Sequence, residues 1–179
     1  QELCLGSTPT DLTVTATGGA SPSSYSYQWY NGTGAIAGAT GATFTPPTST
    51  VGTTTYYVIV TTSASGCSTT SGNTTVEVIP SPNFTVQPEP TQTVCLDGAT
   101  TALTVSVQNF VGTATYQWYS NTISSDTGGT LIVGATSSSY TPLSTTTGTK
   151  YYYCVVSFSD GGCTSITSDL GQVTVQPDV

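Results

Sequence analysis

The feature that most constrains the fold is a short word that occurs twice. YQWYNGT spans residues 27–33 and YQWYSNT spans residues 116–122, and these words hold both tryptophans of the 179-residue chain. Other matches follow in the same order in both halves: GAT at 38–40 and 134–136, FTP at 44–46 and YTP at 140–142, GTTTYYVIV at 52–60 and GTKYYYCVV at 148–156. Ordered matches of this kind indicate an internal duplication, so we expect two copies of one structural unit.

The boundary between the copies lies in the segment IPSPNFTVQPEP, residues 79–90. Its four prolines favour a short, stiff linker that runs into the next strand. We therefore predict one domain at residues 1–80 and a second domain at residues 81–179.

The residue pattern within each copy is that of short β-strands. DLTVTAT at 11–17 and ALTVSV at 102–107 alternate apolar and polar residues, as half-buried strands do. TTYYVIV at 54–60 and KYYYCVV at 150–156 are rich in the aromatic and β-branched residues that favour strands. Glycine, serine and proline clusters separate these segments, and no window of useful length has a helical period. The predicted fold class is all-β, with two tandem immunoglobulin-like β-sandwich domains.

The repeated aromatic residues are candidates for the core. In an immunoglobulin-type sandwich, one tryptophan on a central strand fills the middle of the core. Trp29 and Trp118 follow the first alternating strand, as that residue does, so we expect them in the core rather than on a sugar-stacking surface. Tyr56 and Tyr152, on the long aromatic strands, are expected in the core as well.

A second set of tyrosines is expected on the outer face. Because side chains alternate along a strand, Tyr30 and Tyr119 should face away from the tryptophans beside them. Together with Tyr57 and Tyr153 on the long aromatic strands, they are the candidate contact residues of an exposed surface.

The order of the shared words carries a resemblance to a known family. The words are Leu-Thr-Val at 12–14 and 103–105, the two Tyr-Gln-Trp-Tyr words, the Gly-Ala-Thr and Thr-Pro words, Gly-Cys at 66–67 and 162–163, and Val-x-Val at 76–78 and 173–175. This order resembles the Ig-like repeats of very large secreted surface proteins of the Bacteroidetes type, many exported by the type IX route. The resemblance implies extracellular tandem modules that act as stalks, spacers or adhesins, and it implies no catalytic residues.

Five cysteines indicate an oxidising, extracellular compartment. The repeat matches Cys4 with Cys95 and Cys67 with Cys163. Each copy thus has one cysteine before its first alternating strand and one in the hairpin after its long aromatic strand. We predict disulfides 4–67 and 95–163.

The fifth cysteine, Cys154, takes the place that Val58 has in the first copy. We expect it to be reduced and buried, as a small hydrophobic residue. The rival pairing is a bridge between Cys95 and Cys154 that leaves Cys163 free.

The composition argues against several classes of function. One basic residue, Lys150, stands against nine acids for a net charge of −8, which disfavours binding to nucleic acid and to anionic membrane surfaces. Without histidine the usual catalytic triads cannot form, and the scattered acids offer no facing carboxylate pair for glycoside hydrolysis. The chain also has no Cys-x-x-Cys motif and no apolar run of roughly 18 residues. We predict no enzyme, no metal, no cofactor and no membrane insertion.

These observations favour a non-catalytic structural or adhesive module outside the cell or on its surface. The first hypothesis is a subunit of a cell-surface fibre or tandem Ig-like array that associates head to tail, with itself or with neighbouring Ig-like repeats. The alternatives are a module that binds surface glycans and a spacer from a larger adhesin or secreted enzyme. Exposed tyrosines gathered in one groove would favour glycans, whereas tyrosines spread over lateral faces would favour assembly.

The copies differ before their first cysteine. The second copy has NFTVQPEPTQTVC at 83–95, in which FTVQ at 84–87 has the pattern of a sheet-edge strand, while the first copy has only QELC at 1–4. We expect the first copy to lack this strand and to expose an edge and an apolar slot. VTVQPDV at 173–179 is a candidate to fill the slot of a neighbour, and such a contact extends into a fibre because it does not close.

Overall fold

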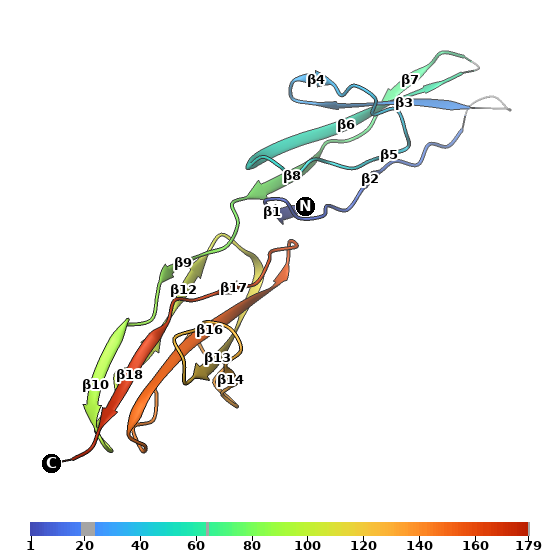
Figure 1. Cartoon of the computed structure of the whole chain (residues 1–179). Helices are drawn as coiled ribbons and strands as arrows, with labels where there is room; N and C mark the ends of the chain where they lie inside the picture. The colour runs from blue at the N-terminus through green and yellow to red at the C-terminus, as the bar shows by residue number, and fades with distance from the viewer. Residues whose placement is uncertain (19–23, 64, 179) are drawn as a thin grey trace. The chain divides into compact units, whose positions relative to one another are not determined.

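The computed structural model describes residues 1–18, 24–63 and 65–178. Its internal contacts divide the chain into Gln1–Pro80, called unit 1 here, and Ser81–Val179, called unit 2. Among the described residues, all of the regular secondary structure is β-strand, which confirms the predicted all-β class (Figure 1). None of the described segments forms a helix long and apolar enough to span a membrane.

The described residues of unit 1 form eight strands. They are β1 (Glu2–Cys4), β2 (Leu12–Thr13), β3 (Tyr25–Asn31), β4 (Gly34–Ala35), β5 (Thr43–Phe44), β6 (Gly52–Thr62), β7 (Ser68–Thr70) and β8 (Thr74–Ile79). The larger sheet has the order β1-β8-β6-β3-β4, with β7 also on β6. The small β2–β5 pair forms the opposite layer.

Unit 2 repeats this plan and adds to it. Its strands are β9 (Asn83–Val86), β10 (Thr91–Cys95), β11 (Leu103–Thr104), β12 (Ser106–Gln108), β13 (Val111–Asn121), β14 (Thr130–Leu131), β15 (Ser139–Tyr140), β16 (Gly148–Asp160), β17 (Ile166–Thr167) and β18 (Gly171–Gln176). The larger sheet has the order β10-β18-β16-β13-β14, with β17 on β16. The opposite layer contains the pairs β11–β15 and β12–β9.

In both units the strand that ends in the first cysteine runs parallel to the last strand, while the central strands are antiparallel. β1 pairs with β8, and β10 pairs with β18, in parallel ladders (Figure 1). The residues that alternate inward from β6 and β16 meet the tryptophan of the neighbouring strand and the small opposite layer. Each unit therefore has its own core, as an independent sandwich requires.

Candidate functional site

The repeated Gln-Trp-Tyr word builds the same local structure in both units. The Gln28 side-chain amide donates hydrogen bonds to the backbone carbonyls of Trp29 and Ile36, at 2.9 and 2.8 Å. Gln117 makes the two corresponding bonds in unit 2, at 2.9 Å each. These glutamine hydrogen bonds therefore connect the central strand with the segment that follows it.

The tryptophan of each word occupies the middle of its core. Trp29 is 3% exposed and Trp118 is 0% exposed. Their indole N–H groups donate to the backbone carbonyls of Gly41, at 3.0 Å, and Ser137, at 2.9 Å, two positions that match in the repeat. Because the only polar atom of each ring is paired, burial carries little desolvation cost.

The core tyrosines lie against the opposite layer. The ring of Tyr56 is 5.4 Å from that of Phe44, and the ring of Tyr152 is 5.7 Å from that of Tyr140. Both Tyr56 and Tyr152 are buried. Burial, with a smaller contribution from Tyr140, raises the pKa of Tyr152 to about 12.

The candidate contact tyrosines form two stacked pairs, one in each unit. The rings of Tyr30 and Tyr57 are 5.0 Å apart and nearly parallel, at 3°. The rings of Tyr119 and Tyr153 are 5.2 Å apart at 8°. In each pair one ring face covers the other, so the four rings do not make a single flat platform.

The prediction that Tyr153 is an exposed contact residue is wrong, because Tyr153 is only 3% exposed. The connection that leads into β14 lies over its ring, and the backbone N–H of Gly129 donates to its hydroxyl at 3.0 Å. The corresponding connection in unit 1 is a two-residue turn, residues 32–33, and Tyr57 stays half-exposed there.

The predicted disulfides are not present. Cys4 and Cys163 are each disulfide-bonded, whereas Cys67 and Cys95 are exposed free thiols. Cys154 is a buried free thiol. The pairings 4–67 and 95–163 are therefore wrong, and so is the rival bridge between Cys95 and Cys154.

Strand direction explains the error in unit 1. Cys4 lies opposite Ile79 in the parallel β1–β8 ladder, at the end of the sandwich where β6 begins. Cys67 follows the other end of β6, where the backbone N–H of Thr62 donates to its carbonyl at 2.9 Å. The 11 residues of β6 span about 35 Å, whereas a disulfide joins Cα atoms less than about 7 Å apart.

Unit 2 has the same geometry. Cys95 lies opposite Gln176, at the end where β16 begins. Cys163 follows the last residue of β16, and the backbone N–H of Val111 donates to its sulfur at 3.4 Å. The 13 residues of β16 separate the two ends by about 40 Å. Because β1 and β10 run parallel to the last strands of their units, the two cysteines of one unit lie at opposite ends.

Cys154 is a core residue of β16. Its side chain is 0% exposed, and burial raises the pKa of the thiol to about 11. Its backbone N–H donates to the Ser168 hydroxyl at 2.9 Å. Ser71 accepts the N–H of Val58 in the same way in unit 1, at 3.0 Å. The two serines hold matching positions between the last two strands of their units.

Unit 1 has a groove with a volume of about 360 Å³. One wall is the segment 15–18 that follows β2, and the other wall is residues 67–69 with Val60 and Thr62 of β6. Tyr25 lies at the groove and donates through its hydroxyl to the carbonyl of Gly18. The lining is apolar and hydroxyl-bearing and contains no charged side chain.

In unit 2 a strand fills the matching position. The repeat matches residues 15–17 with β12, and β12 pairs with β9 in an antiparallel ladder that places Phe84 opposite Val107. Both side chains pack against the core, and the Gln87 side-chain carbonyl accepts the N–H of Asp169 at 3.0 Å. Within the part of unit 1 that the structure describes, no strand pairs with residues 15–17.

The expected donor of a filling strand is not free. Residues 171–176 of the last segment form β18, which pairs with β10 on one side and β16 on the other. VTVQPDV at 173–179, the candidate to fill a neighbour's slot, is therefore not available over residues 173–176, which lie within β18. The sequence shows the alternation of this segment but not that both its edges are occupied.

Sequence reasoning missed one exposed apolar surface of unit 2. Leu131, Val133 and Leu143 are 47%, 90% and 71% exposed, and they line a groove of about 340 Å³ with Lys150. A pattern could have indicated it, since Val133 and Leu143 stand in connections and Leu131 ends the two-residue strand β14. No group of three or more potential metal ligands forms among the described residues.

Comparison with protein families gives one match for each unit. The model of a family described as "Domain of unknown function (DUF8696)" matches residues 1–80 and again residues 85–177. No curated protein sequence matches this chain.

Solved structures show the same fold at low sequence identity. Three N-terminal domains of the Highly Immunogenic Outer Capsid protein (Hoc) of bacteriophage RB49 match with a TM-score of 0.67 and 19% identity, over 98% of this chain and 67% of that one. An E-to-A variant of titin domains I67–I69 matches with a TM-score of 0.59 and 16% identity, over 98% and 62%. The N-terminal eight Ig domains of Down Syndrome Cell Adhesion Molecule match with a TM-score of 0.52 and 15% identity, over 97% and 23%. These likenesses confirm two tandem Ig-like sandwiches.

Proposed function

This chain belongs to the family described as a domain of unknown function (DUF8696), and we propose that it is a non-catalytic structural or adhesive module of an extracellular, head-to-tail array. The observation that carries the proposal is the groove of unit 1, at the position that β9 fills in unit 2. The disulfide-bonded Cys4 and Cys163 support an oxidising compartment. The Bacteroidetes-type surface location is part of the same proposal.

The groove suits an extended polypeptide segment. Residues 15–17 offer backbone groups without a strand partner among the described residues, and such an edge is a template for another strand. Main-chain hydrogen bonds along this edge would provide affinity, and the apolar floor near Val60 would receive an alternate side chain. The uncharged lining fits a segment as uncharged as Asn83–Val86.

The proposed occupant is a β9-type segment of a neighbouring repeat. Within this chain, the segment that follows the last strand of unit 1, residues 80–86, supplies the edge strand of unit 2. Applied to an array, the same rule gives unit 1 the segment that follows the last strand of the preceding repeat. Each junction would then be heterologous and would extend rather than close.

A strand peptide tests this function directly. We would add a labelled peptide of residues 81–89 to the full chain and follow binding by fluorescence anisotropy and hydrogen-exchange mass spectrometry. The expected result is saturable binding with new protection at residues 14–18 and 67–69. A scrambled peptide, and a peptide with Phe84→Ser, should bind at least tenfold more weakly, because Phe84 is the inward side chain of β9.

A matched pair of protein variants locates the site. Ala16→Asp places a charge in the groove and should abolish peptide binding, whereas Thr53→Asp on the exposed part of β6 should leave it unchanged. Thermal melts show whether both variants fold. Peptide binding that ignores the Phe84→Ser change, or protection outside the groove, would reject strand capture.

The glycan-binding alternative has weaker support. The stacked pairs Tyr30–Tyr57 and Tyr119–Tyr153 belong to different units, and Tyr153 is buried. Tyrosines spread in this way favour an assembly role over a single sugar-binding groove.

A further inference from the structure

We propose that Cys95 of one molecule forms an intermolecular disulfide with Cys67 of the next molecule, so that copies of this chain are joined covalently head to tail. This inference rests on the proposed head-to-tail function and adds a covalent link to it. Cys67 and Cys95 are both exposed free thiols, which thiol–disulfide exchange requires.

The repeat defines two kinds of cysteine. The first-strand cysteines, Cys4 and Cys95, end β1 and β10, and the hairpin cysteines, Cys67 and Cys163, follow β6 and β16. One cysteine of each kind, Cys4 and Cys163, is disulfide-bonded in this chain. One of each kind is left as an exposed thiol. Each exposed thiol therefore stands at a repeat position that carries a disulfide in the other unit.

The bonded cysteines lie at the end of each unit that adjoins the linker. Cys4 is opposite Ile79, the last strand residue before the linker. In unit 2, the sulfur of Cys163 accepts the backbone N–H of Val111. Asn109, two residues before Val111, donates through its side-chain amide to the side chain of Asn83, at the start of β9, at 2.9 Å.

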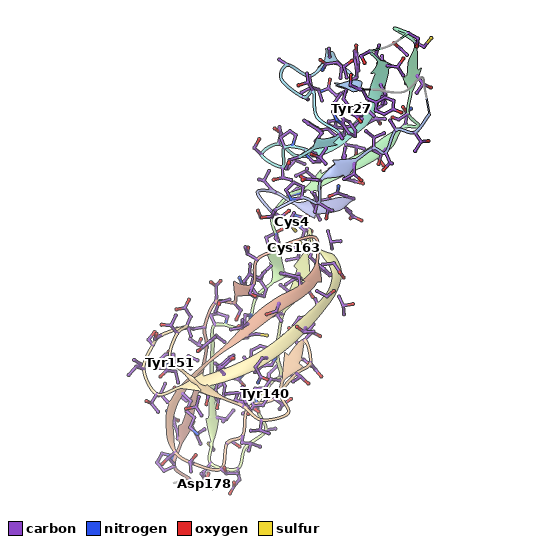
Figure 2. All side chains as sticks on the ribbon, turned by 90° about the vertical axis from the view of Figure 1, so that its right-hand side faces the viewer. Cys4, Tyr27, Tyr140, Tyr151, Cys163 and Asp178 are labelled. Carbon is purple, nitrogen blue, oxygen red and sulfur yellow. The ribbon has the colours of Figure 1, made fainter. Side chains whose placement is uncertain are left out.

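The free thiols lie at the opposite end of each unit. Cys67 follows the end of β6 that is remote from Ile79, and Cys95 lies opposite Gln176. Figure 2 shows the two ends of unit 2, with Cys163 at one and Asp178, two residues after Gln176, at the other. The end of unit 1 away from the linker thus carries a hairpin thiol, and the corresponding end of unit 2 carries a first-strand thiol.

The two thiols are of unlike kinds, which determines the product. A bond between Cys95 and Cys67 is heterologous, and it leaves one thiol at each end of the growing product. A bond between two copies of the same cysteine would join the molecules symmetrically, with two copies of the other cysteine at the ends, and would break the head-to-tail order. Because the proposed head-to-tail array brings unlike ends of successive molecules together, we infer the unlike pairing.

Cys67 also lines the groove proposed for the strand of a neighbour. A segment that enters the groove would bring the end of the preceding repeat to this thiol. The strand contact would raise the local concentration of the partner thiol, and the disulfide would then fix the junction.

The chemistry balances with a disulfide as oxidant, such as oxidised glutathione or a protein disulfide donor. The Cys67 thiolate attacks the donor, whose sulfur–sulfur bond breaks to give a mixed disulfide and one released thiol. The Cys95 thiolate of another molecule attacks the Cys67 sulfur and releases the second thiol. Two protein thiols lose two protons and two electrons, and the donor disulfide takes them up as two thiols.

The test uses the full chain in a glutathione redox buffer, with non-reducing electrophoresis and peptide mapping. Wild-type protein should give a ladder of dimers and higher multimers that reductant collapses. Cys67→Ser and Cys95→Ser should each stay monomeric alone, but an equimolar mixture of the two should give a dimer with a linked 67–95 peptide. Cys154→Ser should give the wild-type ladder, because that thiol is buried.

Two outcomes would overturn the inference. One is wild-type protein that stays monomeric in the redox buffer, and the other is a dominant 67–67 or 95–95 dimer from a single variant. Strand capture is measured separately by the peptide experiment with the thiols reduced. Peptide binding without a ladder would reject only the proposed covalent link. A ladder without peptide binding would reject only strand capture by the groove.

Discussion

The two units share their centre and differ at one edge. In both, the core tryptophan donates its indole N–H to a backbone carbonyl, and the glutamine before it bonds to the segment that follows the strand. In both, a serine between the last two strands accepts a backbone N–H. Unit 2 then closes the edge of its smaller layer with β9, whereas unit 1 has a groove there. The words repeated in the sequence thus specify the core, and the segments that are not repeated account for the difference at this edge.

The added edge of unit 2 comes with longer central strands. β13 has 11 residues where β3 has 7, and β16 has 13 where β6 has 11. Phe158 lies on the longer β16 and Phe110 immediately precedes β13, and their rings stack at 5.0 Å. Among the described residues, more apolar side chains pack in the core of unit 2 than in that of unit 1, so we expect unit 2 to be the more stable unit.

The largest difference is expected from the matching core leucines. Leu103 is 0% exposed and Leu12 is 8% exposed. Leu103→Ala should destabilise unit 2 by about 3–5 kcal/mol, and Leu12→Ala should destabilise unit 1 by about 2–3 kcal/mol, because the better-packed site leaves the larger cavity. Hydrogen-exchange mass spectrometry reports the two units separately. Equal losses would show that the two cores are packed alike.

A second experiment converts the edge of unit 2 into that of unit 1. Phe84→Ser removes the side chain that anchors β9 on the core and should cost unit 2 about 2–3 kcal/mol. Exchange at residues 106–108 should rise to the level of residues 15–17. Val86→Ser is the matched control, since Val86 is 44% exposed on the same strand, and its effect should stay within about 0.5 kcal/mol.

Alternation and repeat matching account for what the sequence could predict. They place Trp29, Trp118, Tyr56 and Tyr152 on inward-facing positions, where the structure buries them. They also indicate an edge strand at FTVQ, residues 84–87, most of which lies in β9.

Strand direction and connection length account for what it could not predict. The pattern of β1 is the same for a parallel and an antiparallel partner, but only the parallel pairing moves Cys4 to the end opposite Cys67. The alternation of Tyr153 shows its face, but not that the segment containing Gly129 folds over it. Both errors concern contacts between segments distant in sequence, which local periodicity does not encode.

Substitution of the serines between the last two strands of each unit should give a smaller difference in stability between the units. Ser168 is 1% exposed and accepts the backbone N–H of Cys154, while Ser71 is half-buried and accepts that of Val58. Alanine leaves each N–H without its acceptor, at a cost of about 2 kcal/mol for Ser168 and about 1 kcal/mol for Ser71, where water has better access. Urea unfolding followed by hydrogen exchange measures both, and a larger effect at Ser71 would contradict the burial argument.

The smallest difference is a pH effect confined to unit 2. Burial holds the pKa of the Cys154 thiol at about 11, above its ordinary value of 9.0, whereas unit 1 has Val58 at this position. Between these pH values the unfolded chain has lost a proton that the folded unit still holds. The stability that the buried, protonated Cys154 thiol contributes is therefore fully present below pH 9.0 and is lost as the pH rises toward about 11.

Cys154→Val should remove this dependence while changing the stability at neutral pH by less than about 1.5 kcal/mol, because the volumes are similar. Urea unfolding followed through Trp118, in a Trp29→Phe background, isolates unit 2. Wild-type stability should fall between about pH 9 and pH 10, and that of the variant should stay nearly level. Above this window both should fall, because burial holds the pKa of Tyr152 at about 12, above its ordinary value of 10.0. Unit 1, followed through Trp29 in a Trp118→Phe background, should lack the Cys154-dependent loss, and the same loss there would assign it to another group.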